Sequence, residues 1–120
     1  MLIKKLMAAF REHPPRSIAG LDVAEVYDYK THEIRSVRDS APSRPLPDPS
    51  GDLMIFHLDQ SEVRFAARPS GTEPKIKFYL FARSDVADRR SLPDAKRRTA
   101  ELMDRMSADI EAYIQAVLAS

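Results

Sequence analysis

Apolar residues recur at helical spacing toward both ends of the chain. The first stripe predicts an amphipathic helix that the double proline at 14–15 must end, and it consists of Leu2, Ile3, Leu6, Met7 and Phe10. The second stripe predicts a long helix with one inward face, and it consists of Leu102, Met103, Met106, Ile110, Tyr113, Val117 and Leu118. Ser91 and Asp94 form a capping-box arrangement ahead of the second stripe. One helix is therefore expected before the central part of the sequence and one after it.

Strands are predicted between these helices. Residues 17–30 read as one strand, and the nearly continuous apolar run at 52–59 is suited to a buried strand. The segments 62–68 and 75–83 alternate between apolar and polar residues, which is typical of half-buried strands. The short links between the last three segments imply antiparallel neighbours.

These elements predict a single α+β domain over residues 1–120. It combines an antiparallel sheet of about four strands with helices packed on one face. Residues 36–50 contain four prolines and no periodicity, and they are expected to form a Pro-rich surface loop.

Composition limits the classes of function. The 120 residues carry a net charge of +1, so no global field attracts the chain to nucleic acid or to a membrane. There are no cysteines, which fits a cytoplasmic location, and no apolar run approaches the length of a membrane span. The three histidines show no metal-ligand spacing, and His57 is expected to be a packed or edge side chain of its strand.

The stretch "RPSGTEPKIKFY" (68–79) holds the candidate chemistry. Gly71 permits a close backbone approach, and Ser70 and Thr72 offer hydroxyl donors around it. Arg68 and Lys77 flank this loop with positive charge, and strand alternation places Arg68 on the face turned away from the core. Such groups suit a phosphate monoester, although a wide hairpin whose hydroxyls bind their own backbone would use the same residues.

The order Arg-x-Ser-Gly-Thr-Glu-Pro resembles the phosphate-binding signature of the α-D-phosphohexomutases, the superfamily of phosphoglucomutase and phosphomannomutase. The segment "FREHPPRSIAGLDVAEVYDYK" (10–30) resembles the entry to the C-terminal, fourth domain of those enzymes. The strand "DLMIFHLD" and the long final helix extend the resemblance over nearly the whole chain. The fold it implies is TATA-binding-protein-like.

The resemblance also implies a function. Arg68, Ser70, Gly71, Thr72 and Lys77 would hold the substrate phosphate that is not being transferred. The partners would be a phosphosugar and the other three domains of the same enzyme, with neither nucleic acid nor membrane involved. The whole enzyme would interconvert hexose 1-phosphate and hexose 6-phosphate, and it would use magnesium and a hexose 1,6-bisphosphate activator.

The family's other motifs do not occur in this sequence. We find no "TASHNP"-type phosphoserine loop, no "DGDGDR"-type magnesium loop and no "GEESG"-type sugar loop. We therefore expect a domain fragment with no catalytic or metal-binding residues and no cofactor of its own, inactive alone. Two alternatives stay open: a stand-alone domain that senses sugar phosphates, and a nucleic-acid-binding module suggested by the basic and aromatic residues of "KIKFYLFAR" (75–83).

Overall fold

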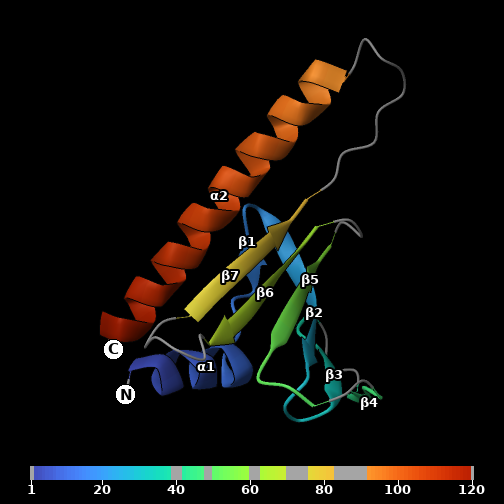
Figure 1. Ribbon diagram of the computed structural model, residues 1–120, viewed down its shortest axis with the longest axis vertical. Coiled ribbons are helices and arrows are strands. Elements are labelled where there is room, and N and C mark those ends of the chain that lie inside the picture. Colours follow the sequence, from blue (N-terminus) through green and yellow to red (C-terminus); the bar gives the residue numbers. More distant parts are fainter. Residues whose placement is uncertain are drawn as a thin grey trace.

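The computed structural model describes residues 2–38, 42–47, 50–59, 63–69, 76–82 and 92–119. Its elements in chain order are α1 (Leu2–Glu12), β1 (Ser17–Ile18), β2 (Leu21–Asp28), β3 (Glu33–Ser36), β4 (Arg44–Pro45), β5 (Met54–Leu58), β6 (Arg64–Pro69), β7 (Ile76–Phe81) and α2 (Leu92–Ala119). Figure 1 shows both helices beside one sheet. The predicted Ser91 cap lies outside the described residues.

The sheet confirms the α+β class and corrects the expected number of strands. Over the described ranges it has seven strands in the order β4-β3-β2-β5-β6-β7, with β1 paired to β2. Every pairing is antiparallel. The count exceeds about four because β3 and β4 were not expected and because residues 17–30 form two strands. The likeness to TATA-binding protein stays a prediction.

A tight turn divides residues 17–30. Ile18 pairs with Leu21, and the two residues between them have positive φ angles, 55° at Ala19 and 77° at Gly20. Two such residues make a two-residue hairpin whose twist matches that of its strands. Alanine seldom adopts this conformation, which is why the sequence suggests a continuous strand. The Asp109 carboxylate accepts a hydrogen bond of 2.6 Å from the Ala19 N–H and thereby ties the turn to α2.

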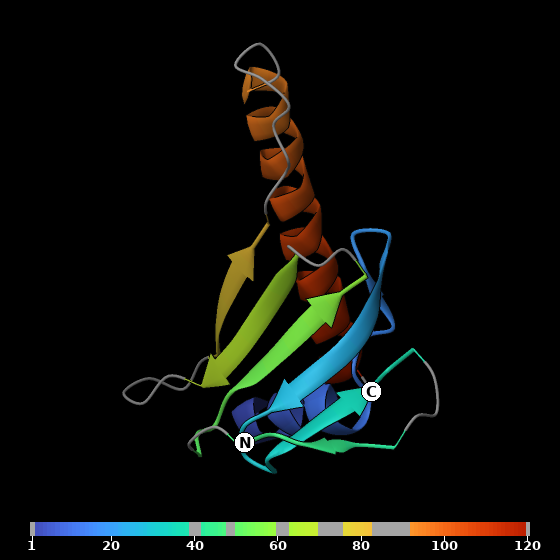
Figure 2. The same ribbon diagram turned by 90° about the vertical axis from the view of Figure 1, so that its right-hand side faces the viewer.

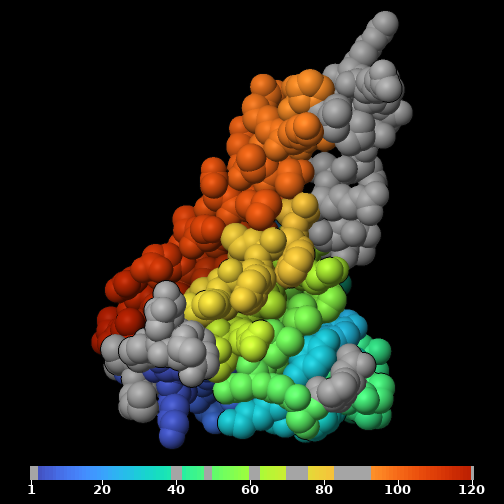
Figure 3. Space-filling model, viewed as in Figure 1, coloured from blue at the N-terminus to red at the C-terminus, as the bar shows by residue number. Residues whose placement is uncertain are grey.

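Both helices cover the same face of the sheet. Figure 2 shows the sheet in front and the helices behind it, and Figure 3 shows α2 running along the molecule past the end of the sheet. The Tyr113 hydroxyl of α2 donates a 2.6 Å hydrogen bond to the His13 carbonyl just after α1, and burial raises the pKa of Tyr113 to about 12. The core forms between the covered face and the two helices, and it includes Met7, Phe10, Ile18, Val23, Val26, Met54, Phe56, Leu58, Val63, Phe65, Ala67, Met106 and Ile110.

The Pro-rich segment 36–50, which was expected to be a surface loop, contains the short strand β4. β4 pairs with β3 as an edge strand of two residues, and Pro45 is tolerated there. The next residue, Leu46, is buried, and its N–H donates to the His32 carbonyl at 2.9 Å. Residues 39–41 and 48–49 of this segment lie outside the described residues.

Candidate functional site

Arg68 and Lys77 face each other across two neighbouring strands. Arg68 lies near the end of β6 and Lys77 near the start of β7, and the register makes them direct cross-strand partners. Both are exposed, whereas the adjacent Ala67 is fully buried. The strand alternation therefore turns both cations away from the helices, and the predicted exposure of Arg68 is confirmed.

The other three predicted site residues, Ser70, Gly71 and Thr72, lie outside the described residues, so their placement stays a prediction. The structure fixes the two ends of their loop, because Pro69 pairs with Ile76. These two flanking residues are one step beyond the Arg68–Lys77 pair.

Two like charges at directly opposed positions destabilise a sheet. Within the part of the chain that the structure describes, no carboxylate lies at ion-pair distance from Arg68 or from Lys77. An anion bound between them would relieve their repulsion. Arginine can hold two oxygens of such an anion with its planar fork, and lysine can add a point charge.

Aromatic and basic side chains continue from this pair along the open face, by which we mean the sheet face turned away from the helices. Tyr79 and Phe81 are 43% and 45% exposed, and the Arg64 guanidinium lies 4.8 Å from the centre of the Phe81 ring. Farther across, the Tyr27 and His57 rings lie 4.3 Å apart. Burial, followed by the charge of Arg64, holds the pKa of His57 below its usual range, although Glu25 opposes this shift. His57 is a packed strand residue, as expected.

A buried ion cluster was missed by the sequence analysis. The fully buried Asp28 carboxylate accepts hydrogen bonds from Arg11 Nε at 2.8 Å and from Arg35 Nη2 at 3.2 Å. The N–H groups of Lys30 and Thr31 donate to its other oxygen at 3.0 and 3.3 Å. Burial alone would raise the pKa of Asp28, but Arg11 and the two N–H groups hold that pKa below its ordinary value. The cluster ties α1 to the sheet. The sequence signal for it is Asp28 itself, an acidic residue at a position where strand alternation after Val26 predicts an inward side chain.

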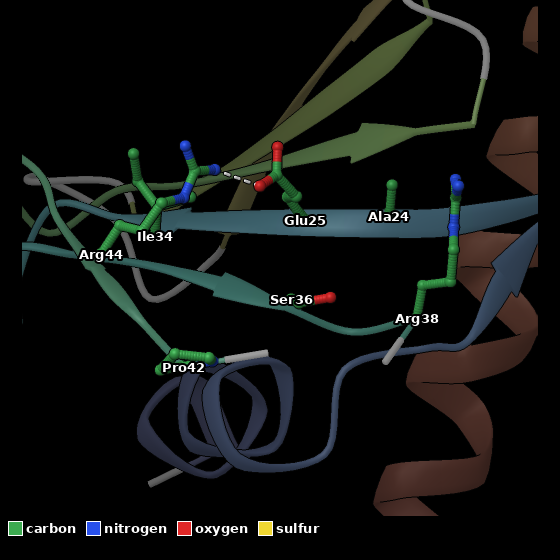
Figure 4. A pocket seen from close by; sticks show the side chains of 7 residues that line it. All are labelled: Ala24, Glu25, Ile34, Ser36, Arg38, Pro42 and Arg44. Atoms are coloured by element: carbon green, nitrogen blue, oxygen red, sulfur yellow. Dashed lines mark hydrogen bonds and ion pairs between the residues drawn. The ribbon is translucent and has the colours of Figure 1, made fainter. Parts of the chain in front are cut away.

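A separate pocket of about 520 Å³ lies over β2, β3 and the segment that leads into β4 (Figure 4). Arg38 and Arg44 line it, but each already pairs with a carboxylate, Arg38 with Asp59 and Arg44 with Glu25. A bound anion would have to compete with those carboxylates. This pocket is therefore less suited to phosphate than the Arg68–Lys77 pair.

Among the described residues, no cluster of three or more His, Asp or Glu side chains could hold a metal ion. No helix in the described ranges is long and apolar enough to cross a membrane.

Known proteins match nearly the whole chain. It is 42% identical over 116 residues to a probable phosphomannomutase of Haemophilus influenzae, a match that covers 97% of this chain and 18% of that protein. It is 37% identical over 78 residues to a Staphylococcus aureus phosphoglucomutase, which covers 65% of this chain and 14% of that protein. The chain thus spans less than a fifth of the length of these curated relatives. No family model and no solved structure matches the chain. The relatives confirm the resemblance to the phosphohexomutase superfamily.

Proposed function

We propose that this chain, a homologue of bacterial phosphomannomutases and phosphoglucomutases over one small part of their length, binds the phosphate group of a hexose phosphate. Arg68 and Lys77 supply the charge, and Ser70, Gly71 and Thr72 supply hydroxyl and backbone N–H donors from the loop between them. The observation that carries the proposal is the pairing of two exposed cations at the base of this loop.

In the whole enzyme this site grips the phosphate that is not being transferred. An enzyme that interconverts hexose 1-phosphate and hexose 6-phosphate must accept its bisphosphorylated intermediate in two orientations. The phosphate grip must then be indifferent to which end of the sugar it holds. Arginine, lysine, hydroxyl and N–H groups meet this need because they recognise phosphate oxygens alone.

The phosphoryl donor, the magnesium site and the sugar-selecting loop belong to other domains of such an enzyme, since their motifs do not occur in these 120 residues. The chain alone should therefore show background turnover in a coupled assay with glucose 1-phosphate, glucose 1,6-bisphosphate and magnesium. Turnover that scales with the amount of this chain and survives repurification would contradict the assignment of these catalytic parts to other domains.

Calorimetric titration with glucose 6-phosphate tests the site itself. Arg68→Ala should weaken binding by about tenfold to a hundredfold, because a charge-assisted hydrogen bond contributes roughly 1.5–3 kcal/mol. Arg68→Lys should restore part of the affinity, since a point charge cannot reproduce the arginine fork.

Three controls complete the titration. Arg97→Ala removes an exposed arginine of α2 and should leave binding unchanged. Glucose without phosphate should not bind.

The basic and aromatic open face would also suit a single-stranded oligonucleotide. Salt-dependent oligonucleotide binding with no response to glucose 6-phosphate would favour that alternative and reject the phosphate site.

A further inference from the structure

Two exposed aromatic residues lie on the open face of β7. Tyr79 and Phe81 are 43% and 45% exposed, and they are the exposed large hydrophobic residues of the described chain. Alternation along the strand places both on the same face as Lys77, the face that is turned toward the viewer in Figure 2. Aromatic rings beside a few polar groups are the usual lining of small-molecule sites. The surroundings of the two rings differ, and the difference singles out Tyr79.

The Phe81 ring already has a partner. The Arg64 guanidinium lies 4.8 Å from the centre of that ring, in a cation–π contact. The Tyr79 ring contacts no other ring and no cation among the described residues, and its hydroxyl makes no hydrogen bond to any of them. Tyr79 therefore offers a ring and a hydroxyl to a ligand.

Tyr79 is also the nearer of the two to the proposed phosphate site. It lies two residues after Lys77 on the same face of β7, a spacing of roughly 7 Å along a strand, whereas Phe81 is roughly 13 Å away. Arg68, the cross-strand partner of Lys77, is the diagonal neighbour of Tyr79. A phosphate held between Arg68 and Lys77 therefore lies next to Tyr79.

A hexose phosphate fits this arrangement. Its sugar ring is joined to the phosphate through one oxygen at C1, or through one carbon and one oxygen at C6, so the ring lies close to the phosphate in both isomers. The C–H groups on a face of the sugar carry partial positive charge, and the face of an aromatic ring is negative. A flat contact between the two rings does not depend on which end of the sugar carries the bound phosphate.

We propose that the Tyr79 ring supports the sugar ring of a hexose phosphate whose phosphate group lies between Arg68 and Lys77. This inference rests on the proposed function, because it places the sugar relative to that phosphate site. The aromatic contact adds affinity for the sugar and leaves the grip on the phosphate independent of the sugar's orientation. Tyr79 is thus a substrate-binding residue that favours phosphate monoesters with a sugar ring over those without one.

Two phosphate monoesters test the proposal, glucose 6-phosphate and glycerol 3-phosphate, of which the second lacks a sugar ring. Titrations of the isotope-labelled chain, followed through its backbone amide signals, give both affinities. The wild type should bind glucose 6-phosphate about twofold to tenfold more tightly, the factor that a favourable aromatic contact contributes. Tyr79→Ala should remove this preference by weakening the binding of glucose 6-phosphate alone. Glucose 1-phosphate should lose affinity by the same factor.

Two further variants locate the effect. Tyr79→Phe keeps the ring and should keep most of the preference for glucose 6-phosphate. Phe81→Ala removes an equally exposed ring that lies farther from the phosphate site, and it should leave the ratio of the two affinities unchanged. A loss in Tyr79→Phe as large as that in Tyr79→Ala would contradict the role of the ring.

The outcomes separate this inference from the proposed function. A wild type that binds both monoesters equally, or a Tyr79→Ala variant that keeps the preference, would overturn the role of Tyr79 and leave the phosphate site in place. A wild type that binds neither monoester would reject the phosphate site, and the role of Tyr79 with it.

Discussion

The two faces of the sheet place their side chains in opposite surroundings. On the helix-covered face Phe56 and Phe65 are fully buried against Phe10 of α1, which is itself fully buried, and the Phe56 and Phe65 rings stack 4.5 Å apart. On the open face Arg68 and Lys77 are exposed. The covered face holds the fold together, whereas the open face leaves polar groups free to meet a ligand. Substitutions on the two faces should therefore have separable effects on stability and on binding.

The largest difference in the free energy of unfolding is expected between alanine substitutions of two aromatic residues. Phe10 lies within 4.7–5.7 Å of the rings of Phe56, Phe78 and Tyr113, so Phe10→Ala should lower the free energy of unfolding by about 3–5 kcal/mol. Tyr79→Ala on the open face should cost less than about 1 kcal/mol. Urea denaturation measures both, and equal losses would show that the open face also belongs to the core.

The buried ion cluster should come next. Asp28→Asn removes the charge that Arg11 and Arg35 share, and it should lower the free energy of unfolding by about 1.5–3 kcal/mol. The matched control is Asp104→Asn at an exposed position of α2, which should stay within about 0.5 kcal/mol of the wild type. If the two variants unfold alike in urea, the cluster does not anchor α1.

Acid should destabilise the chain in two steps. The pKa of His57 is lowered in the folded chain. Below the usual histidine value of 6.5, the unfolded chain therefore binds a proton that the folded chain does not, and the free energy of unfolding decreases as the pH is lowered. Asp28 adds a later loss, because its folded pKa lies below the ordinary 3.8 and its stabilisation disappears as pH falls through that region. His57→Gln should remove the first step and keep the second. Thermal unfolding followed from pH 8 to pH 3 checks this, and a wild type without the upper step would contradict the account of His57.

Strong alternation made part of the fold predictable. β6 and β7 follow runs in which apolar and polar residues alternate, β5 follows a nearly continuous apolar run, and the three strands lie where they were expected. β3 was missed because all four of its residues are half-buried, so no contrast marks its two faces. In β2, a register shift between Val23 and Glu25 interrupts the alternation of inward and outward side chains.

The site was predictable to the extent that it rests on strand alternation. The exposure of Arg68 followed from its alternation with Val63, Phe65 and Ala67, which are buried. Its direct pairing with Lys77 depends on the register across the hairpin, which sequence spacing alone does not fix. The Asp28 cluster depends on three segments that meet only in the folded chain, so a local pattern could not reveal it.

Arg68→Ala should have the smallest effect on stability. Arg68 is exposed and lies opposite a like charge, so its loss should change the free energy of unfolding by no more than about 0.5 kcal/mol. Lys77→Ala should be equally mild, because either change relieves the repulsion between the two cations. A large loss of stability on urea denaturation would mean that one of these side chains supports the fold.

The central claim is that the hairpin around Arg68 and Lys77 binds phosphate. The most direct test is a titration of the isotope-labelled chain with inorganic phosphate, followed through its backbone amide signals. The account predicts that the signals of Ser70, Gly71 and Thr72 shift in the wild type and that Arg68→Ala weakens these shifts while the chain stays folded. Phosphate-induced shifts confined to other parts of the chain, alike in wild type and Arg68→Ala, would contradict the claim.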